Sequence, residues 1–567
     1  MLKGIAASSG YVIAKVYKLQ QPVLNIERKQ ANAEEEIKKL QAALAKTIKD
    51  IELIKERASA NLTAEELAVF DAHLMMASDP ELIGQMEEMI KNESINADFV
   101  AETVGNMMVS MFESMDNDYF KERAADVKDV TFRLKCNILN VEIPDLTSID
   151  TQVVVVAEDL TPSDTAQLNK NFTKGFATEI GGRTSHSAIM ARSLEIPAVV
   201  GIDDIMKMAK HNDEIILDAV DGLVFLNPTE ELKQEYMAKL EAFIAEKEAL
   251  KVLLDAKSET VDHHEVELAG NIGTPKDVEG VVNNGGEGVG LYRTEFLYMD
   301  TDAFPNEEEQ FEAYKKVLEG MNGKKVVVRT LDIGGDKKLN YFEFPEEMNP
   351  FLGYRAIRLC LDLPHILRTQ LRALIRASIY GKLCIMFPMI ATVDEFKQAK
   401  AIFEEEKAKL VKEGVAVSEE IEVGMMVEIP AAAVLADQFA KYADFFSIGT
   451  NDLIQYSMAA DRMSSKVSYL YQPLNPSILR LVKMTIDGAH AHGKWVGMCG
   501  EMAGDHLSAP VLLGLGLDEF SMSATSILPT RKLIRSLSYA EMKELALQAI
   551  ALDNEQAVIE LVKKTLK

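Results

Sequence analysis

A histidine stands where a strand meets a helix in the segment EIGGRTSHSAIMAR, residues 179–192. The two glycines permit a turn, and Thr184 or Ser185 can cap the helix, so His186 falls in or near its first turn. A phosphoryl group on His186 would meet free backbone N–H groups at the positive end of the helix, and Arg192 two turns further on is an additional cation. The motif therefore predicts a phosphohistidine.

Four arginines are candidates for binding a small anion that carries phosphate and carboxylate groups. A planar guanidinium supplies paired N–H donors, which a lysine cannot. Arg293 and Arg329 have the stronger case, because they lie at strand ends of one predicted barrel, in the strand-like runs GVGLYR and KVVVRTLD. Arg355 and Arg462 are the other two. A single arginine is more often a solvated surface residue, whereas two at strand ends indicate a common site.

Two carboxylates follow similar runs: Glu428 in MVEIP and Asp452 in GTND. On adjacent strands they can converge on one hard divalent cation, with substrate oxygens and water as further ligands. Mg²⁺ is the ion that this set favours. The competing interpretation is a helix N-cap, since Asp and Asn cap helices well where a strand passes into a helix.

Cys499 lies in GMCGE, where flanking glycines would let a substrate approach closely. Buried cysteines are usually inert, but an ordinary thiol, with a pKa of about 8.5, is mostly protonated at neutral pH and can donate a proton to a carbanion-like carbon. Cys136, Cys360 and Cys384 have no such setting and are interpreted as structural.

Eight strand-like segments, with helical stretches between most of them, carry these residues. Such alternation over residues 261–567 is the length and rhythm of a (β/α)₈ TIM barrel, in which catalytic residues lie at the carboxyl ends of the strands. The segments are EVELAGNIG, GVGLYR, KVVVRTLD, LCIMFPMI, EVGMMVEIP, FFSIGTND, WVGMCGEM and EFSMS. The candidate residues fall at those ends.

The first half of the chain predicts a different architecture. Residues 1–25 and 142–228 contain short β-rich runs and form an α/β domain around His186. Residues 26–141 have apolar residues at helical spacing and form an inserted helical subdomain. Residues 229–260 are charged and helical, and they are interpreted as a linker. The fold class is therefore multidomain α/β with a C-terminal barrel.

Charge and composition exclude several function classes. The 567 residues carry 61 Lys+Arg against 89 Asp+Glu, a net charge of −28, which disfavours nucleic acid and anionic membranes and favours a basic protein partner. The four scattered cysteines indicate a reducing, cytoplasmic compartment. No signal-peptide core or apolar run of about 18 residues is present. No P-loop, GxGxxG motif after a strand or GxSxG elbow is apparent.

The motifs together resemble a known family. GGRTSHSAIMAR with LTPSDTAQL upstream, GVGLYRTEF, VVVRTLDIGGDK, NPFLGYRAIR, MVEIPAAA, FFSIGTNDLIQY and GMCGEMAGD are similar to Enzyme I, the phosphoenolpyruvate-protein phosphotransferases of the bacterial sugar phosphotransferase system. The resemblance runs nearly end to end. It implies transfer of a phosphoryl group from phosphoenolpyruvate to His186 and then to a histidine of the phosphocarrier HPr, with release of pyruvate.

The resemblance also implies roles for individual residues. Cys499 matches the proton donor, and Glu428 and Asp452 match the Mg²⁺ ligands. Thr165 matches a residue that hydrogen-bonds the active histidine. Substrate-binding positions are matched by Arg293, Arg329, Arg355, Asn451, Asp452 and Arg462. The family further implies a homodimer through the barrel and a swing of the histidine domain about the linker. A helical face that docks HPr would use Glu65, Glu66, Asp71, Asp79 and Glu81, although each also reads as an ordinary solvated residue.

Two alternatives remain open at this point. A barrel lyase acting on pyruvate-derived enolates would leave His186 structural. A regulatory protein could instead dock a phosphocarrier without turnover.

Overall fold

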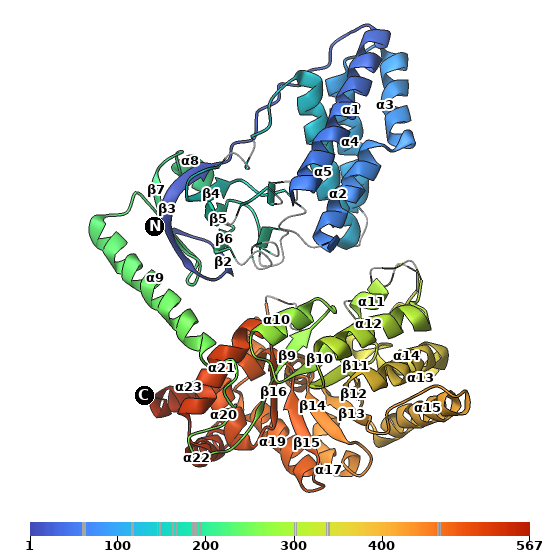
Figure 1. Ribbon diagram of the computed structural model, residues 1–567, viewed down its shortest axis with the longest axis vertical. Coiled ribbons are helices and arrows are strands. Elements are labelled where there is room, and N and C mark those ends of the chain that lie inside the picture. Colours follow the sequence, from blue (N-terminus) through green and yellow to red (C-terminus); the bar gives the residue numbers. More distant parts are fainter. Residues whose placement is uncertain are drawn as a thin grey trace. The chain divides into compact units, whose positions relative to one another are not determined.

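A computed structural model gives the architecture of the chain (Figure 1). It consists of two compact units, Met1–Glu246 and Lys247–Lys567. The residues described are all those of the chain except 59–63, 115–117, 145, 147–148, 162–163, 166, 170, 183–186, 189–190, 192–195, 300, 302, 336, 338, 340, 462–463, 465 and 567, together with the side chains of 57–58, 64–68, 113–114, 118–123 and 125.

An eight-stranded sheet organises the first unit, in the order β1-β8-β7-β3-β4-β5-β6-β2. The central pairs from β3 to β6 are parallel and the outer pairs antiparallel. The strands are β1 Leu2–Lys3, β2 Ile5–Ser8, β3 Tyr11–Lys18, β4 Val153–Ala157, β5 Thr173–Thr178, β6 Ala198–Val200, β7 Glu214–Asp218 and β8 Leu223–Leu226. Strand β4, VVVVA, is buried along its whole length because separate apolar clusters cover its two faces.

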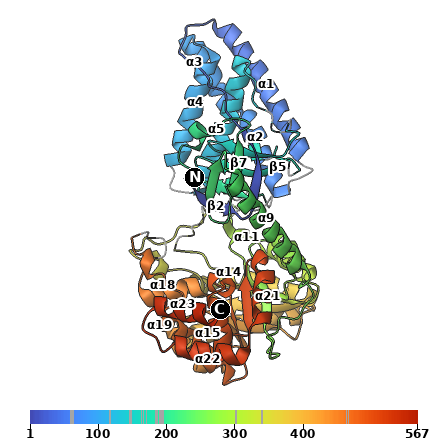
Figure 2. The same ribbon diagram turned by 90° about the vertical axis from the view of Figure 1, so that its left-hand side faces the viewer.

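Helices are inserted between β3 and β4, as the sequence predicts. They are α1 Ala33–Ala58, α2 Ala64–Ala77, α3 Pro80–Glu93, α4 Ala97–Ser114 and α5 Asp118–Leu139. Figures 1 and 2 show them as an elongated bundle. The insert has its own core, in which Leu40, Met86 and Val100 are buried. Asp79 caps α3 by accepting hydrogen bonds from the backbone N–H groups of Glu81 and Leu82.

The helix α9, Glu230–Lys251, continues from the first unit into the residues of the second. Tyr236 is buried, and its hydroxyl donates a 2.8 Å hydrogen bond to Asp218 at the end of β7. The first turns of α9 are therefore anchored to the α/β sheet.

The short helix α8, Ile205–Met208, precedes β7 in the same unit.

A closed barrel of eight parallel strands forms the second unit, which confirms the predicted (β/α)₈ fold. The circle closes where β16 pairs with β9. The strands are β9 Glu267–Ile272, β10 Gly288–Arg293, β11 Lys325–Arg329, β12 Lys382–Phe387, β13 Glu422–Val427, β14 Phe445–Ile448, β15 Trp495–Met498 and β16 Glu519–Met522. Seven of them lie within the segments expected from the sequence, and β12 begins one residue before its segment, LCIMFPMI.

Helices surround this barrel. They are α10 Asp277–Asn283, α11 Phe296–Met299, α12 Glu307–Gly320, α13 Ile357–Asp362, α14 Pro364–Ala377, α15 Val393–Lys412, α16 Pro430–Val434, α17 Ala436–Phe439, α18 Thr450–Met458, α19 Pro476–His490, α20 Ser508–Leu515, α21 Ile527–Ser536, α22 Tyr539–Ala549 and α23 Glu555–Thr565. Capping boxes at Asn306 and Thr392 begin α12 and α15. Among the described residues, none of the helices combines the length and apolarity that crossing a bilayer requires.

Charged side chains form ion pairs at the amino-terminal end of the barrel. The Lys325 ammonium lies 2.8 Å from Glu267 and 2.7 Å from Glu519, and 3.7 Å from the centre of the Trp495 ring. Glu422 accepts a hydrogen bond from the Trp495 indole. Polar residues at this end of a TIM barrel serve stability, whereas the opposite end carries chemistry.

Candidate active site

A cavity of about 320 Å³ lies at the carboxyl ends of the barrel strands. Most of the polar residues singled out from the barrel sequence line it, although they come from five strands or the loops that follow them. They are Arg293, Arg329, Arg355, Glu428, Asn451, Asp452 and Cys499. The structure therefore brings together at one place residues that are more than 200 positions apart in the chain.

Arg329 and Arg355 are almost completely buried and are held by acidic side chains. Arg329 pairs with Glu295 and lies 3.1 Å from Asp332. Arg355 lies 2.8 Å from Asp332 and 3.5 Å from Asp452. These ion pairs fix the guanidinium groups in the cavity wall before any substrate arrives, so little reorganisation is needed to bind an anion.

Three carboxylates offer oxygen atoms within 4.8 Å of one another: Asp332, Glu428 and Asp452. All three are buried. Burial, and then the negative charges of Asp452 and Asp332, raise the pKa of Glu428 to about 8. Burial alone would also raise the pKa of Asp332, but the charges of Arg329 and Arg355 lower it instead. This cluster has the hard oxygen ligands that a divalent cation prefers.

Local structure explains why the carboxylates of Glu428 and Asp452 face the cavity. Glu428 directly follows β13, and one of its oxygens accepts a 2.8 Å hydrogen bond from the backbone of Met389, a residue with a left-handed φ of 56°. Asp452 lies in the first turn of α18, whose N-cap residue is Gly449. The capping interpretation of Asp452 is therefore wrong.

Cys499 follows β15 and is 3% exposed. Its backbone N–H donates to the carbonyl of Ile448 at 3.2 Å. Burial raises the pKa of the thiol to about 11, although neighbouring groups, Arg329 among them, oppose the shift. The thiol is therefore neutral near pH 7 and carries a proton that it can donate.

Asn451 also lines the cavity, and its side-chain oxygen accepts a 2.8 Å hydrogen bond from the Tyr471 hydroxyl. The sequence-based assignment missed three charged residues of the cavity: Glu295, Asp332 and Lys337. Asp332 and Glu295 each lie within three residues of a predicted arginine, at the same strand ends. Their closeness in the sequence to Arg329 and Arg293 was the signal that could have identified Asp332 and Glu295 as residues of the site.

Several predicted residues cannot be placed at this site. His186, Arg192 and Arg462 lie outside the described residues. Thr165 is buried, and its hydroxyl donates to the carbonyl of Thr161 at 3.2 Å.

Of the suggested docking carboxylates, Glu65 and Glu66 belong to α2, and their side chains are not described. Asp71 pairs with Lys55 at 2.5 Å, Asp79 caps α3, and Glu81 lies in its first turn. Asp71 and Asp79 therefore each have a structural role of their own.

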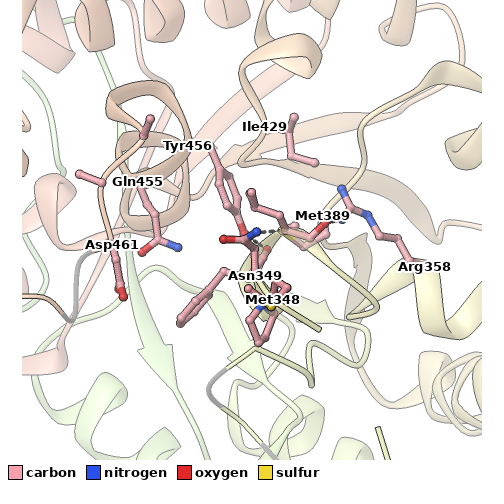
Figure 3. A pocket seen from close by; sticks show the side chains of 13 residues that line it. Met348, Asn349, Arg358, Met389, Ile429, Gln455, Tyr456 and Asp461 are labelled. Atoms are coloured by element: carbon pink, nitrogen blue, oxygen red, sulfur yellow. Dashed lines mark hydrogen bonds between the residues drawn. The ribbon is translucent and has the colours of Figure 1, made fainter. Parts of the chain in front are cut away.

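A second, larger cavity of about 530 Å³ adjoins the charged one and has a mainly apolar wall (Figure 3). Met348, Ile429 and Met389 are among its lining residues. Tyr456 links the two cavities, because its hydroxyl accepts a 3.2 Å hydrogen bond from Arg355 and donates one of 2.6 Å to the carbonyl of Phe351. The few charged groups of the larger cavity do not converge, so the smaller, charged cavity is the candidate site.

Replacing Tyr456 with phenylalanine tests this link. The variant loses the hydroxyl that holds Arg355 while keeping the ring, so we expect the KM for an anionic substrate to rise about three- to tenfold with little change in kcat. Steady-state kinetics measure both constants. A lower kcat at an unchanged KM would contradict a role in binding.

Comparison with known proteins identifies the family. Three family models match in order along the chain: the PEP-utilising enzyme N-terminal model over residues 3–123, the mobile-domain model over 149–222 and the PEP-binding-domain model over 247–539. The phosphoenolpyruvate-protein phosphotransferase of Staphylococcus carnosus is 59% identical over 567 residues, covering 100% of this chain and 99% of its own length. The chain belongs to the phosphoenolpyruvate-protein phosphotransferase family.

Other members of the phosphoenolpyruvate-protein phosphotransferase family match equally well. Those of Bacillus subtilis and Listeria monocytogenes are each 59% identical, over 100% and 99% of both chains respectively. The resemblance drawn from the motifs is thereby confirmed. The PEP-binding-domain match spans the barrel strands, and the mobile-domain match spans the segment that contains His186.

Proposed function

We propose that the chain is a phosphoenolpyruvate-protein phosphotransferase that transfers the phosphoryl group of phosphoenolpyruvate to its own His186, releases pyruvate and passes the group to a histidine of HPr. This would be the first step of sugar uptake by the phosphotransferase system. The observation that carries the proposal is the barrel cavity, where buried arginines, three carboxylates and a protonated thiol converge in a chain of this family.

The arginines would bind the substrate anion. Arg329 and Arg355 offer donors from one wall of the cavity, and Arg293 lies at the end of the neighbouring strand β10. In the described part of the chain, the Nε atoms of Arg329 and Arg355 are buried without a hydrogen-bond partner. Buried donors are normally satisfied, so these atoms support a site shaped for a ligand. We assign Asn451 and Arg462 to the same substrate.

Asp332, Glu428 and Asp452 would hold Mg²⁺. Their chemistry fits the ion, because buried carboxylates that crowd within 4.8 Å repel one another unless a cation or protons compensate them. When bound, the ion would neutralise phosphate charge and stabilise the enolate oxygen. The role of the protein is to hold the three oxygens on the ends of separate strands and loops.

Cys499 would complete the reaction. After the phosphoryl group leaves, the enolate of pyruvate takes a proton at its methylene carbon, and the buried thiol supplies it. The resulting keto form is the more stable tautomer. Its formation removes the enolate, and this makes the overall phosphoryl transfer from phosphoenolpyruvate favourable. Thr165 and Arg192 would orient and stabilise His186 and its phosphoryl group. Because His186 and the barrel belong to different units, we infer that the segment 229–260 acts as the hinge.

Partners and location follow from the same proposal. HPr, a basic partner for a chain of net charge −28, would dock on the helical insert, where Asp71 and Glu81 are exposed. A homodimer would form through the barrel. The four cysteines are free, which suits a reducing cytoplasm.

The proposal is tested with phosphoenolpyruvate labelled in its phosphoryl group. With Mg²⁺ and without nucleotide, we expect acid-labile label on the protein and one pyruvate released per label. Pyruvate release from phosphoenolpyruvate without any labelled protein would favour the lyase alternative. A protein that neither becomes labelled nor releases pyruvate would favour the binding-protein alternative.

The affinity for Mg²⁺ should depend on pH. Glu428 has a pKa of about 8 in the cation-free site, so below that pH a proton competes with the ion. We expect the apparent affinity to rise roughly tenfold per pH unit up to about pH 8 and then to level off. Calorimetric titration across this range measures it. An affinity that is flat with pH would contradict the assignment, whereas Glu428→Gln should bind weakly and lose the pH dependence.

A further inference from the structure

Ser447 is a buried residue with an unusual hydroxyl. It lies on β14, which pairs in parallel with β15, so that Ser447 is opposite Gly497 and Ile448 opposite Met498. Ser447 has no exposed surface, and its hydroxyl has no hydrogen-bond partner within the part of the chain that the structure describes. Leaving a buried hydroxyl unpaired costs stability, so such a group calls for an explanation.

Cys499 lies on the same face of the sheet as Ser447, because it comes two residues after Gly497, the partner of Ser447, and continues the pairing with β14. In the resting state the thiol can donate a hydrogen bond to the carbonyl oxygen of Ile448, which lies 3.8 Å from the sulfur. The Cys499 carbonyl accepts a 3.0 Å hydrogen bond from the Asn271 side chain on β9. The backbone of Cys499 is therefore held by Ile448 of β14 and by the Asn271 side chain of β9.

The charge on the sulfur decides what Ser447 can do. A neutral thiol sulfur is a weak acceptor, but the thiolate is a strong one, and the Ser447 hydroxyl is close enough to hydrogen-bond it. The charged groups that face the sulfur are Arg293 of β10, Arg329 of β11 and Glu428 beyond β13. The two arginines favour a thiolate and an ionised Glu428 opposes it, and a hydrogen-bond donor on the β14 side would add to the stabilisation.

We propose that Ser447 is a positioning residue for proton transfer, donating a hydrogen bond to the Cys499 thiolate as it forms. The inference rests on the proposed function. In this step the S–H bond breaks and a C–H bond forms at the methylene carbon of the enolate. The oxygen electron pair of the enolate becomes the carbonyl bond of pyruvate, and the thiolate later regains a proton from water. A donor fixed where charge develops accelerates such a step without reorganisation.

Ser447→Ala separates this role from a structural one. We expect exchange of the pyruvate methyl protons in deuterium oxide with Mg²⁺, followed by proton NMR, to slow about ten- to a hundredfold, because a hydrogen bond to a charged group is lost. Labelling of the protein by phosphoenolpyruvate should change little. The melting temperature should change little, since the Ser447 hydroxyl makes no hydrogen bond of good geometry within the described part of the resting enzyme. Ser447→Thr keeps the hydroxyl and should restore most of the exchange.

A matched control is Thr485→Ala on α19, which removes a buried hydroxyl that donates a 3.0 Å hydrogen bond to Leu481. It should lower the melting temperature and leave the exchange unchanged. Exchange at the wild-type rate in Ser447→Ala, or an equal loss of labelling and exchange, would overturn the role of Ser447. A wild-type protein that is labelled but does not exchange protons would also overturn it. A wild-type protein that is not labelled would overturn the proposed function itself.

Discussion

Replacing His186 with alanine should abolish labelling of the protein by phosphoenolpyruvate. The imidazole nitrogen is the nucleophile in the proposed reaction, and alanine offers none, so labelling should fall to background rather than merely slow down. Transfer to HPr should be lost with it. Acid-labile label, counted after rapid denaturation, measures the effect.

The control for this variant is another histidine of the same unit. His211 lies beside Tyr17, 5.3 Å between ring centres, and has no proposed part in the reaction. His211→Ala should be labelled like the wild type. Label of normal amount on His186→Ala would show that the phosphoryl group resides elsewhere, and the role of His186 would then have to be abandoned.

Glu428→Gln should lower the rate of labelling about 10²–10³-fold at a fixed Mg²⁺ concentration, because several kcal/mol of charge stabilisation are lost with one ligand of the cation. The side chain keeps its size, and its oxygen can still accept the hydrogen bond from Met389, so the fold should persist. Rapid-quench labelling measures the rate, and a Mg²⁺ titration shows whether more of the ion rescues it.

Strand β13 contains its own control. Glu422 begins the strand at the amino-terminal end of the barrel and accepts a hydrogen bond from Trp495, whereas Glu428 follows its other end. Glu422→Gln should react at nearly the wild-type rate with, at most, a small loss of stability. Equal losses in both variants would mean that strand integrity, and not the cation site, controls the reaction.

The barrel could be predicted from the sequence because its signal is local. Each strand is a short apolar run followed by a polar residue, and helical stretches separate most of the runs, so the closed circle of strands follows from order alone. The same logic placed Arg329, Glu428 and Cys499 at one end. The carboxyl ends of the strands meet at one end of a TIM barrel, independently of the conformation of the loops.

What the sequence did not predict depends on the loops and on contacts distant in the chain. Asp332 is the third carboxylate of the cluster because the loop after β11 turns it toward Arg355, 23 residues later, and nothing in the spacing shows that turn. The unpaired hydroxyl of Ser447 could be found only from the packing of β14 against β15.

Asp79 has a structural role that local sequence chemistry also indicates. The run SDPEL is the signature of a helix N-terminus, with Asp as the cap and Pro in the first turn, and the structure assigns Asp79 that structural role. The suggested docking face includes this capping residue, and its part in docking stays a prediction. Local capping chemistry can thus be read from the sequence, but it has to be considered before a surface role is given to an acidic residue.

The central claim is that His186 receives the phosphoryl group of phosphoenolpyruvate. Its most direct test is to locate the group in the intact protein by mapping peptides under alkaline conditions, which preserve a phosphorus–nitrogen bond. After reaction with phosphoenolpyruvate and Mg²⁺, we expect one phosphorylated peptide, with the phosphoryl group on His186. A phosphoryl group found on another residue, or none at all while pyruvate is still released, would contradict the claim.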